Sequence, residues 1–186
     1  NGTALGADAS LKYNEDPVRL SLTYGYGAVT YRAAENRLGA WADQSLIEYS
    51  PPHDLRHKVG VTAGFDADWV SANVRWQYTS GRPYTQVYGY DTMLEIRGLR
   101  DDPTSAVGIP RALYQRPYEA RLPAYHRLDV SLQRQFTLSP SVGLTAEAGA
   151  INSYNRSNVF YIDIFTLDRV DQLPVIPYLS LSVDIN

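Results

Sequence analysis

The segment WVSANVRWQYT, Trp69 to Thr79, constrains the fold of this chain more than any other. From residue 70 on, the even-numbered positions carry Val, Ala, Val, Trp and Tyr, and the odd-numbered positions carry Ser, Asn, Arg, Gln and Thr. Successive side chains of a β-strand point to opposite faces of a sheet, so this alternation predicts a strand with one apolar and one polar face. The apolar face ends in Trp76 and Tyr78, while the polar face carries large polar groups. That combination is typical of a strand with lipid on one side and water on the other.

The composition excludes several classes of protein. The net charge of -3 argues against nucleic-acid binding. Without cysteine the chain has neither a disulfide framework nor a thiolate metal site. No run of eighteen apolar residues exists, which excludes a transmembrane helix but not a transmembrane strand. The 15 tyrosines against 4 phenylalanines suit surfaces that are half wet, such as membrane interfaces and ligand-binding loops.

Other segments alternate in the same way and give a set of about seven strands. The predicted strands cover residues 5–13, 18–28, 59–65, 69–79, 128–136, 142–150 and 179–185. The sixth is expected to continue, through a bend at 152–158, into residues 159–162. No segment of comparable length has a helical period, and each run is close to the length that a tilted strand needs to cross a bilayer. We therefore predict an all-β, antiparallel fold in which residues 1–186 belong to one domain.

The connections between these strands alternate in length. Short turns are expected at residues 14–17, 66–68 and 139–140, and long irregular segments at 32–56, 80–123 and 168–174. Outer-membrane barrels have tight periplasmic turns and long extracellular loops. Single-chain bacterial barrels have an even number of strands, and an open sheet edge is costly in lipid. An odd count therefore predicts one arc of a larger transmembrane β-barrel.

Two other folds fit parts of the pattern. If residues 159–167 form a separate strand, the count becomes eight and a small closed barrel is possible. A soluble β-sandwich or a lipocalin-like binder would also alternate, since a soluble sheet has one buried face.

Four motifs resemble the C-terminal part of TonB-dependent outer-membrane receptors, particularly the Bacteroidetes-type branch with a carboxypeptidase-like regulatory domain. They are HDLRH at 53–57, SGRPYT at 80–85, RLPAYHRLDVS at 121–131 and NSYNRSN at 152–158. The resemblance covers Ser50 to Asn186, and the first two strands match by pattern only. The chain departs from the family at Ile185-Asn186, where such barrels usually end on an aromatic residue.

The resemblance implies a 22-stranded barrel with a plugged lumen, of which this chain supplies the last seven strands. It implies a protein of the Gram-negative cell outer membrane that imports a bulky solute, such as a chelate, a glycan or a peptide. The implied partners are outer-membrane lipid, the TonB system acting through a plug outside these residues, and a surface lipoprotein. A barrel that does not transport, but acts as an adhesin or an assembly scaffold, is the alternative function.

Three groups of residues are candidates for interaction sites. Rigid aromatic rings and forked donors suit ligand recognition by extracellular loops, and the loop candidates are Arg82, Tyr84, Tyr88, Tyr90, Arg97, Arg111, Tyr114, Arg116 and Tyr118. The residues expected to face the lumen, where they pack against the plug or line a substrate path, are Asn73, Arg75, Gln77, Arg127, Asp129, Gln133 and Glu147. The main residues expected in the two membrane girdles are Tyr24, Tyr26, Trp69, Trp76, Tyr78 and Phe136, with Arg134 reaching toward the interface.

Metal binding and catalysis are not favoured by the residue spacing. His53 and His57 are four apart, but they stand beside two prolines at a strand start, which indicates a polar collar rather than a helical metal site. The carboxylates of Asp91, Glu95, Asp101 and Asp102 match no calcium loop, and Arg97 and Arg100 neutralise them. We expect no enzyme activity and no cofactor.

Overall fold

The computed structural model describes residues 1–34, 46–93 and 108–185. The described residues form only strands and their connections, and contain no helix long and apolar enough to cross a membrane. The chain is thus all-β, as predicted, and its sheets are antiparallel.

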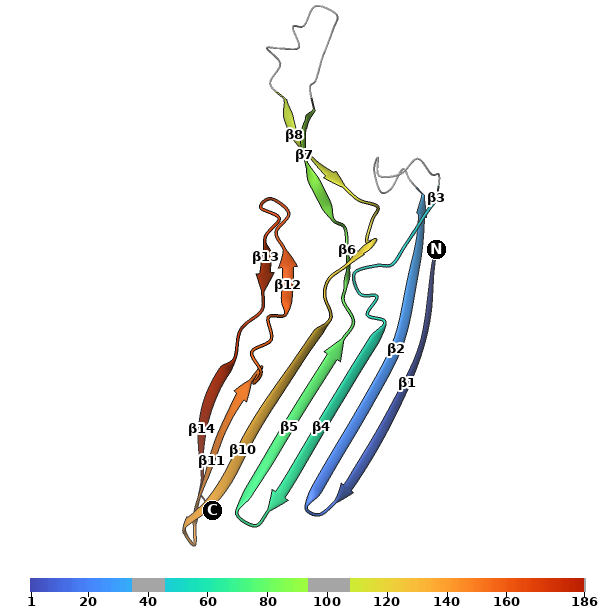
Figure 1. The fold of residues 1–186 in the computed structure, drawn as a ribbon. Coiled ribbons are helices and arrows are strands. Elements are labelled where there is room, and N and C mark those ends of the chain that lie inside the picture. The colour runs from blue at the N-terminus through green and yellow to red at the C-terminus, as the bar shows by residue number, and fades with distance from the viewer. Residues whose placement is uncertain (35–45, 94–107, 186) are drawn as a thin grey trace, which may run out of the picture.

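One large sheet dominates the structure (Figure 1). Its path runs through β1 (Gly2–Glu15), β2 (Val18–Ala34), β4 (His57–Ala67), β5 (Val70–Thr79), β10 (Tyr125–Ser139), β11 (Val142–Ile151) and β14 (Ile176–Ile185), with β3 (Leu46–Tyr49) paired to the end of β2. The turns at residues 16–17, 68–69 and 140–141 lie at one end of this sheet, together with the C-terminus. The long connections and the N-terminus lie at the other, which we call the rim end.

The predicted strands coincide with these long strands in position and in phase. Val74, for example, pairs with Ala63 on one side and Val130 on the other, so the apolar positions of three strands share one face. The structure extends several strands beyond the predicted bounds. It also places Trp69 in the turn before β5 rather than in the strand.

The long connections are not irregular throughout, contrary to our prediction. They contain small two-stranded sheets: β6 (Pro83–Tyr84) with β9 (Ala120–Arg121), β7 (Val87–Met93) with β8 (Ile109–Tyr114), and β12 (Val159–Ile162) with β13 (Arg169–Asp171). The expectation that β12 continues the sixth strand is wrong, since among the described strands β12 pairs only with β13, in a separate sheet. Asn152 and Asn155 take the left-handed conformation, with φ of 55° and 53°, where the chain leaves the large sheet.

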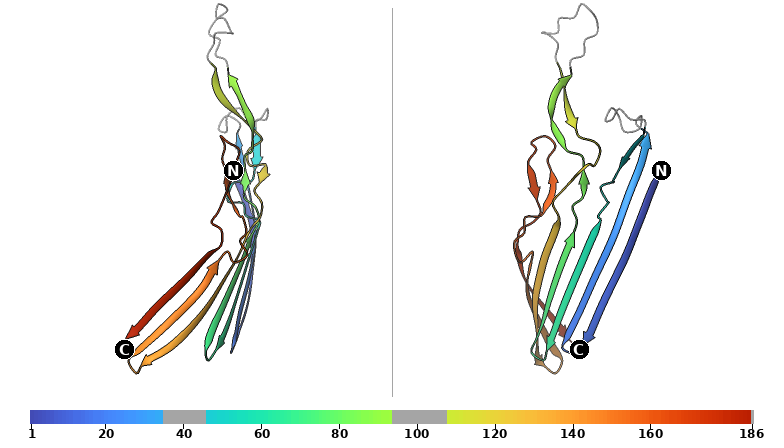
Figure 2. Two further views of the ribbon diagram at one scale, coloured as in Figure 1. Left: turned by 60° about the vertical axis from the view of Figure 1, so that its left-hand side comes forward. Right: turned by 45° about the vertical axis from the view of Figure 1, so that its right-hand side comes forward.

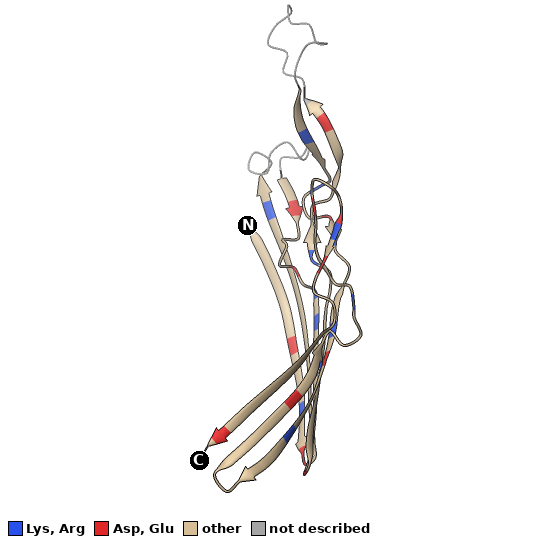
Figure 3. Cartoon of the chain, turned by 90° about the vertical axis from the view of Figure 1, so that its left-hand side faces the viewer, with Lys and Arg blue, Asp and Glu red and all other residues tan. Residues whose placement is uncertain are grey.

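The register joins the apolar positions of neighbouring strands into continuous rows. One row runs from Ala9 through Tyr24, Val59 and Tyr78 to His126, and the row beside it continues the pattern with Leu11, Leu22, Val61, Trp76 and Leu128. Across β11 and β14 the same face carries alanine opposite leucine. Charged positions are sparse along these strands (Figure 3). The result is one extended apolar face and one extended polar face.

Almost none of this apolar surface is buried. Among the described residues, only Ile47 and Val87 are buried hydrophobic side chains. Leu11 is 68% exposed, Leu132 59% and Leu181 64%. A sheet that is apolar on one face must cover that face with a second layer or another apolar medium. The described residues supply no such layer, so the apolar face needs a cover that these residues do not provide.

The large sheet is curved and open (Figure 2). Among the described strands, β1 pairs only with β2, and β14 pairs only with β11, so the sheet does not close on itself. The small closed barrel considered from the sequence is therefore not what the structure shows.

Candidate ligand-binding surface

Asp54 ties strand β2 and two connections together at the rim end. Its carboxylate accepts hydrogen bonds from the backbone N–H of Val29 at 2.8 Å and from the guanidinium of Arg121, and Arg56 lies at 3.4 Å. Arg121 also donates to the backbone carbonyls of Asp54, at 3.0 Å, and Gly81, at 3.1 Å. The Asp54 side chain has no exposed surface. We call these groups the Asp54 clamp, because they join β2, the segment before β4 and the segment around β9.

The clamp keeps Asp54 ionised. Burial of the carboxyl acts to raise its pKa, but the hydrogen bonds from Val29 and Arg121 and the charges of Arg121 and Arg56 together hold the pKa of Asp54 below its ordinary value of 3.8. A carboxylate with a lowered pKa stabilises the folded state fully above the unfolded value, and that contribution is lost as the pH falls through the lowered pKa. At neutral pH the clamp therefore contributes in full.

Two buried asparagines hold the chain where β11 leaves the sheet. The side-chain oxygen of Asn152 accepts a hydrogen bond from the backbone N–H of Arg156 at 2.9 Å, and the backbone N–H of Asn152 donates to the carboxylate of Asp129 at 3.0 Å. Asn158 makes two hydrogen bonds to the backbone of His126, one as donor at 2.9 Å and one as acceptor at 3.1 Å. Both asparagines are nearly fully buried, at 2% and 4% exposure. Their amides replace the ladder hydrogen bonds that the bend removes.

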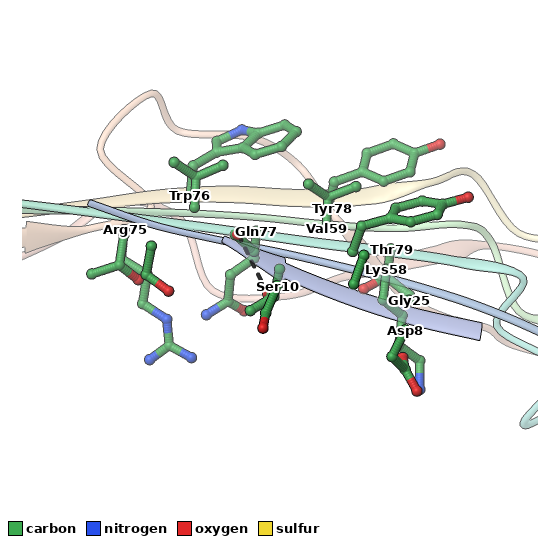
Figure 4. Close-up of a pocket in the computed structure, with 17 residues that line it drawn as sticks. Asp8, Ser10, Gly25, Lys58, Val59, Arg75, Trp76, Gln77, Tyr78 and Thr79 are labelled. Carbon is green, nitrogen blue, oxygen red and sulfur yellow. Dashed lines mark hydrogen bonds between the residues drawn. The ribbon is translucent and has the colours of Figure 1, made fainter. Parts of the chain in front are cut away.

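All seven residues predicted to face the lumen lie on the polar face. Arg127 pairs with Gln77, Asp129 with Arg75, and Gln133 with Glu147, while Asn73 lies opposite Ser131. In Figure 4, Arg75 and Gln77 project away from Trp76 and Tyr78, which lie on the other side of the sheet. Not all seven simply contact solvent, since Asp129 also accepts hydrogen bonds from Arg127 at 2.9 and 3.1 Å.

The polar face contains a hollow and a close contact between two strands. An open hollow of about 590 Å³ lies over β1, β2, β4 and β5, lined by Asp8, Ser10, Thr23, Lys58, Arg75 and Gln77 among others. On β14, Tyr178 lies over Gly149, where a Cβ atom would come within 2.6 Å of the tyrosine ring. The Tyr178 hydroxyl donates to Glu147 at 2.7 Å. Gly149 is therefore required for this close approach, which the alternation did not indicate.

The predicted girdle residues lie at the two ends of the apolar face. Tyr24, Tyr26, Trp76 and Tyr78 occupy the rim end, where Trp76 stacks on Tyr78 with ring centroids 6.2 Å apart. At the opposite end of the sheet, where the short turns lie, Trp69 is 65% exposed and Phe136 is 39% exposed. The guanidinium of Arg134 lies 4.9 Å from the ring centre of Phe136, as a side chain that reaches along an apolar surface does.

The loop candidates for ligand binding do not form one site. Tyr88, Tyr90, Arg111 and Tyr114 lie on the β7–β8 hairpin, which projects from the rim (Figure 1). There Arg111 forms an ion pair with Asp91 through contacts of 2.5 and 2.9 Å. The other described candidates line three further hollows, one at Arg82, one at Tyr84 beside the start of β7, and one at Arg116 and Tyr118.

Two sequence hypotheses fall partly outside the described residues. These are the role of Arg97 and the interpretation of Asp91, Glu95, Asp101 and Asp102, for which calcium binding was considered and not favoured. Of these four carboxylates only Asp91 is described, paired with Arg111. His53 and His57 lie on no helix. The His57 ring is 2.9 Å from the Tyr24 hydroxyl, and that of His53 is 3.3 Å from the Tyr31 hydroxyl. No group of three metal-binding side chains forms within the described ranges.

Comparison with known proteins identifies no relative: no family model, no curated protein and no solved structure matches this chain.

Proposed function

We propose that this chain is one arc of a larger transmembrane β-barrel, of about 22 strands, in the outer membrane of a Gram-negative bacterium. We further propose that the barrel is a TonB-dependent receptor that imports a bulky solute. The observation that supports the barrel best is the one-layer sheet whose apolar face is continuous and exposed. Moving a large apolar side chain out of water gains about 1.5–3 kcal/mol, and the exposed leucines of β1, β2, β10 and β14 would each gain from a lipid cover.

The open edges support an arc rather than a complete barrel. The outer backbone groups of β1 and β14 have no partner strand among the described residues. In lipid each unsatisfied backbone group costs several kcal/mol, so a membrane-embedded sheet needs neighbouring strands at both edges. The grouping of short turns at one end also fits, because outer-membrane barrels have short turns on the periplasmic side.

The receptor part of the proposal rests on the four motifs. Asp54, Gly81 and Arg121 belong to three of these motifs and meet in the Asp54 clamp. Asn152 and Asn158 belong to the fourth, and they bind residues of the third. The motifs are thus a connected set of rim contacts, as expected if they were selected together. The polar face would then surround the plug and the substrate path.

An adhesin or assembly scaffold is the second candidate function. The projecting β7–β8 hairpin favours it, because Tyr88 is 65% exposed and an isolated two-stranded hairpin is marginally stable in water. Such a hairpin suits contact with another macromolecule. Only the importer needs a plug that contacts TonB, so crosslinking of the intact polypeptide to TonB would favour the receptor.

Depth-dependent fluorescence quenching tests the lipid contact. In vesicles containing brominated lipid, a variant whose only tryptophan is Trp76 should be quenched most by bromine near the headgroups, because the residue lies at the rim end of the apolar face. A matched variant with its only tryptophan at position 74, nearer the middle of the strand, should be quenched most by deep bromine. Absence of quenching at both positions would show that this face does not contact lipid.

A further inference from the structure

A polar hollow of about 350 Å³ lies at the rim between two segments that are distant in the sequence. One wall consists of Glu48, Tyr49, Ser50 and Arg56, and the other of residues 116–119 and Arg121. Thr30 of β2 completes the lining. Tyr49 and Tyr118, one from each wall, stack with ring centroids 5.4 Å apart. Two connections therefore form this hollow together, and the Asp54 clamp holds these connections to each other.

Most of the charges in this hollow already have partners. Arg56 and Arg121 pair with the buried carboxylate of Asp54. Glu48 pairs with Arg32 at 2.7 Å. Among the residues that the structure describes, the Arg116 guanidinium has no ion pair or hydrogen bond, although Glu119 lies only three residues away. Arg116 therefore contributes an uncommitted positive charge to a polar hollow.

The segment that carries Arg116 is held in place. Pro117 is buried, and the backbone N–H of Tyr118 donates to the hydroxyl of Thr85 at 3.1 Å. Tyr118 has a φ of 56°, a conformation that non-glycine residues rarely adopt and that persists only when the surroundings fix it. The backbone N–H of Glu119 donates to the carbonyl of Arg116 at 3.4 Å. A fixed segment reduces the ordering cost of binding a ligand.

We propose that this hollow binds a hydroxylated solute with a carboxylate group, and that Arg116 binds the carboxylate. A planar guanidinium matches a carboxylate with two parallel hydrogen bonds. Glu119 and the hydroxyl groups of Ser50 and Thr30 offer acceptors and donors for hydroxyl groups of the same solute. The inference names a substrate class for the proposed importer and rests on that function, although the binding itself can be measured without transport.

Arg82, which also lies in a hollow, fits this chemistry less well. The lining of its hollow is mixed, because apolar Leu122, Pro123 and Phe160 line it together with polar residues. The hollow at Arg116 has an almost wholly polar lining, which suits a hydrated, charged ligand better.

Calorimetric titration of the detergent-solubilised intact protein tests the proposal. The probes are D-galacturonate and D-galactose, which differ by a carboxylate, with citrate as a hydroxylated carboxylate of another shape and inorganic phosphate as an anion without one. We expect at least one of the two carboxylates to bind tenfold or more tightly than galactose and phosphate. Arg116→Gln should remove that preference without changing the melting temperature.

Arg156→Gln is the matched control. Arg156 is an exposed arginine on another connection, outside this hollow, and its hydrogen bonds to other described residues involve its backbone alone. This variant should bind as the unmodified protein does. The proposal is overturned if neither carboxylate binds, if galactose or phosphate binds equally well, or if Arg116→Gln retains the preference. Tryptophan quenching by lipid would be unaffected by any of these results, so failure of this site and failure of the membrane assignment are distinguishable.

Discussion

Val74→Arg should destabilise the protein in a bilayer by about 2–4 kcal/mol, which is the cost of an arginine at the lipid-facing midplane of a barrel. Val74 lies in the middle of β5 on the apolar face, between Ala63 and Val130, and is 39% exposed in the isolated chain. If water covered this face, the same change would be a surface substitution worth within about 0.5 kcal/mol. The measurement is the free energy of unfolding by urea or guanidinium in lipid vesicles.

Asn73→Arg is the control for this prediction. Asn73 is the neighbour of Val74 in β5 and lies at the same depth on the polar face, opposite Gly64 and Ser131. An arginine there would contact water or other polar groups, so the cost should be much smaller. Equal effects at positions 73 and 74 would contradict the assignment of the two faces.

Arg121→Met should destabilise the rim by about 3 kcal/mol, because it leaves the buried carboxylate of Asp54 without its main partner. Removing one member of a buried ion pair costs about 3–5 kcal/mol. The lower end applies here because Arg121 is 31% exposed and because Arg56 and the N–H of Val29 remain beside Asp54. Amide hydrogen exchange measures this loss of stability. Exchange should become faster in the segments around residues 29, 54 and 81.

Two further variants separate this explanation from a general loss of packing. Asp54→Asn combined with Arg121→Met should restore much of the protection, because no buried charge then remains unpaired. Arg111→Met breaks the exposed pair with Asp91 and should have little effect, since exposed pairs contribute little to stability. If the double variant is no more protected than Arg121→Met, the cost does not come from the charge of Asp54.

The long strands could be predicted from the sequence because each alternates over many residues. In β5 every second side chain is apolar, and β10 follows the same alternation except at His126 and Arg134. A register shift of one residue would place the apolar set on the wrong face. The β7–β8 hairpin could not be predicted, because its strands do not alternate over many residues. Its strands are short, Gly89 and Pro110 interrupt them, and the pairing shifts between Val87 and Gly89.

The candidate site was predictable only in part. The loop arginines and tyrosines were recognised by residue type, but type does not tell which of them meet, and the structure separates Tyr88 from Arg116 and Tyr118. Asp54 was part of a recognised motif, yet its importance depends on burial beside Arg121, 67 residues away. No local pattern reports such a contact. The segment that contains Asn152 and Asn158 was predicted to bend, but the hydrogen bonds of these two asparagines could be identified only from the structure.

Hydrogen exchange along the two outer strands tests the central claim most directly. The claim is that β1 and β14 have neighbours in a closed barrel, so in the intact protein in a bilayer the amides on their outer edges should exchange as slowly as those of β4 and β5. Fast exchange along those two edges, with slow exchange in β4 and β5, would show that the sheet ends where this chain ends and would contradict the barrel.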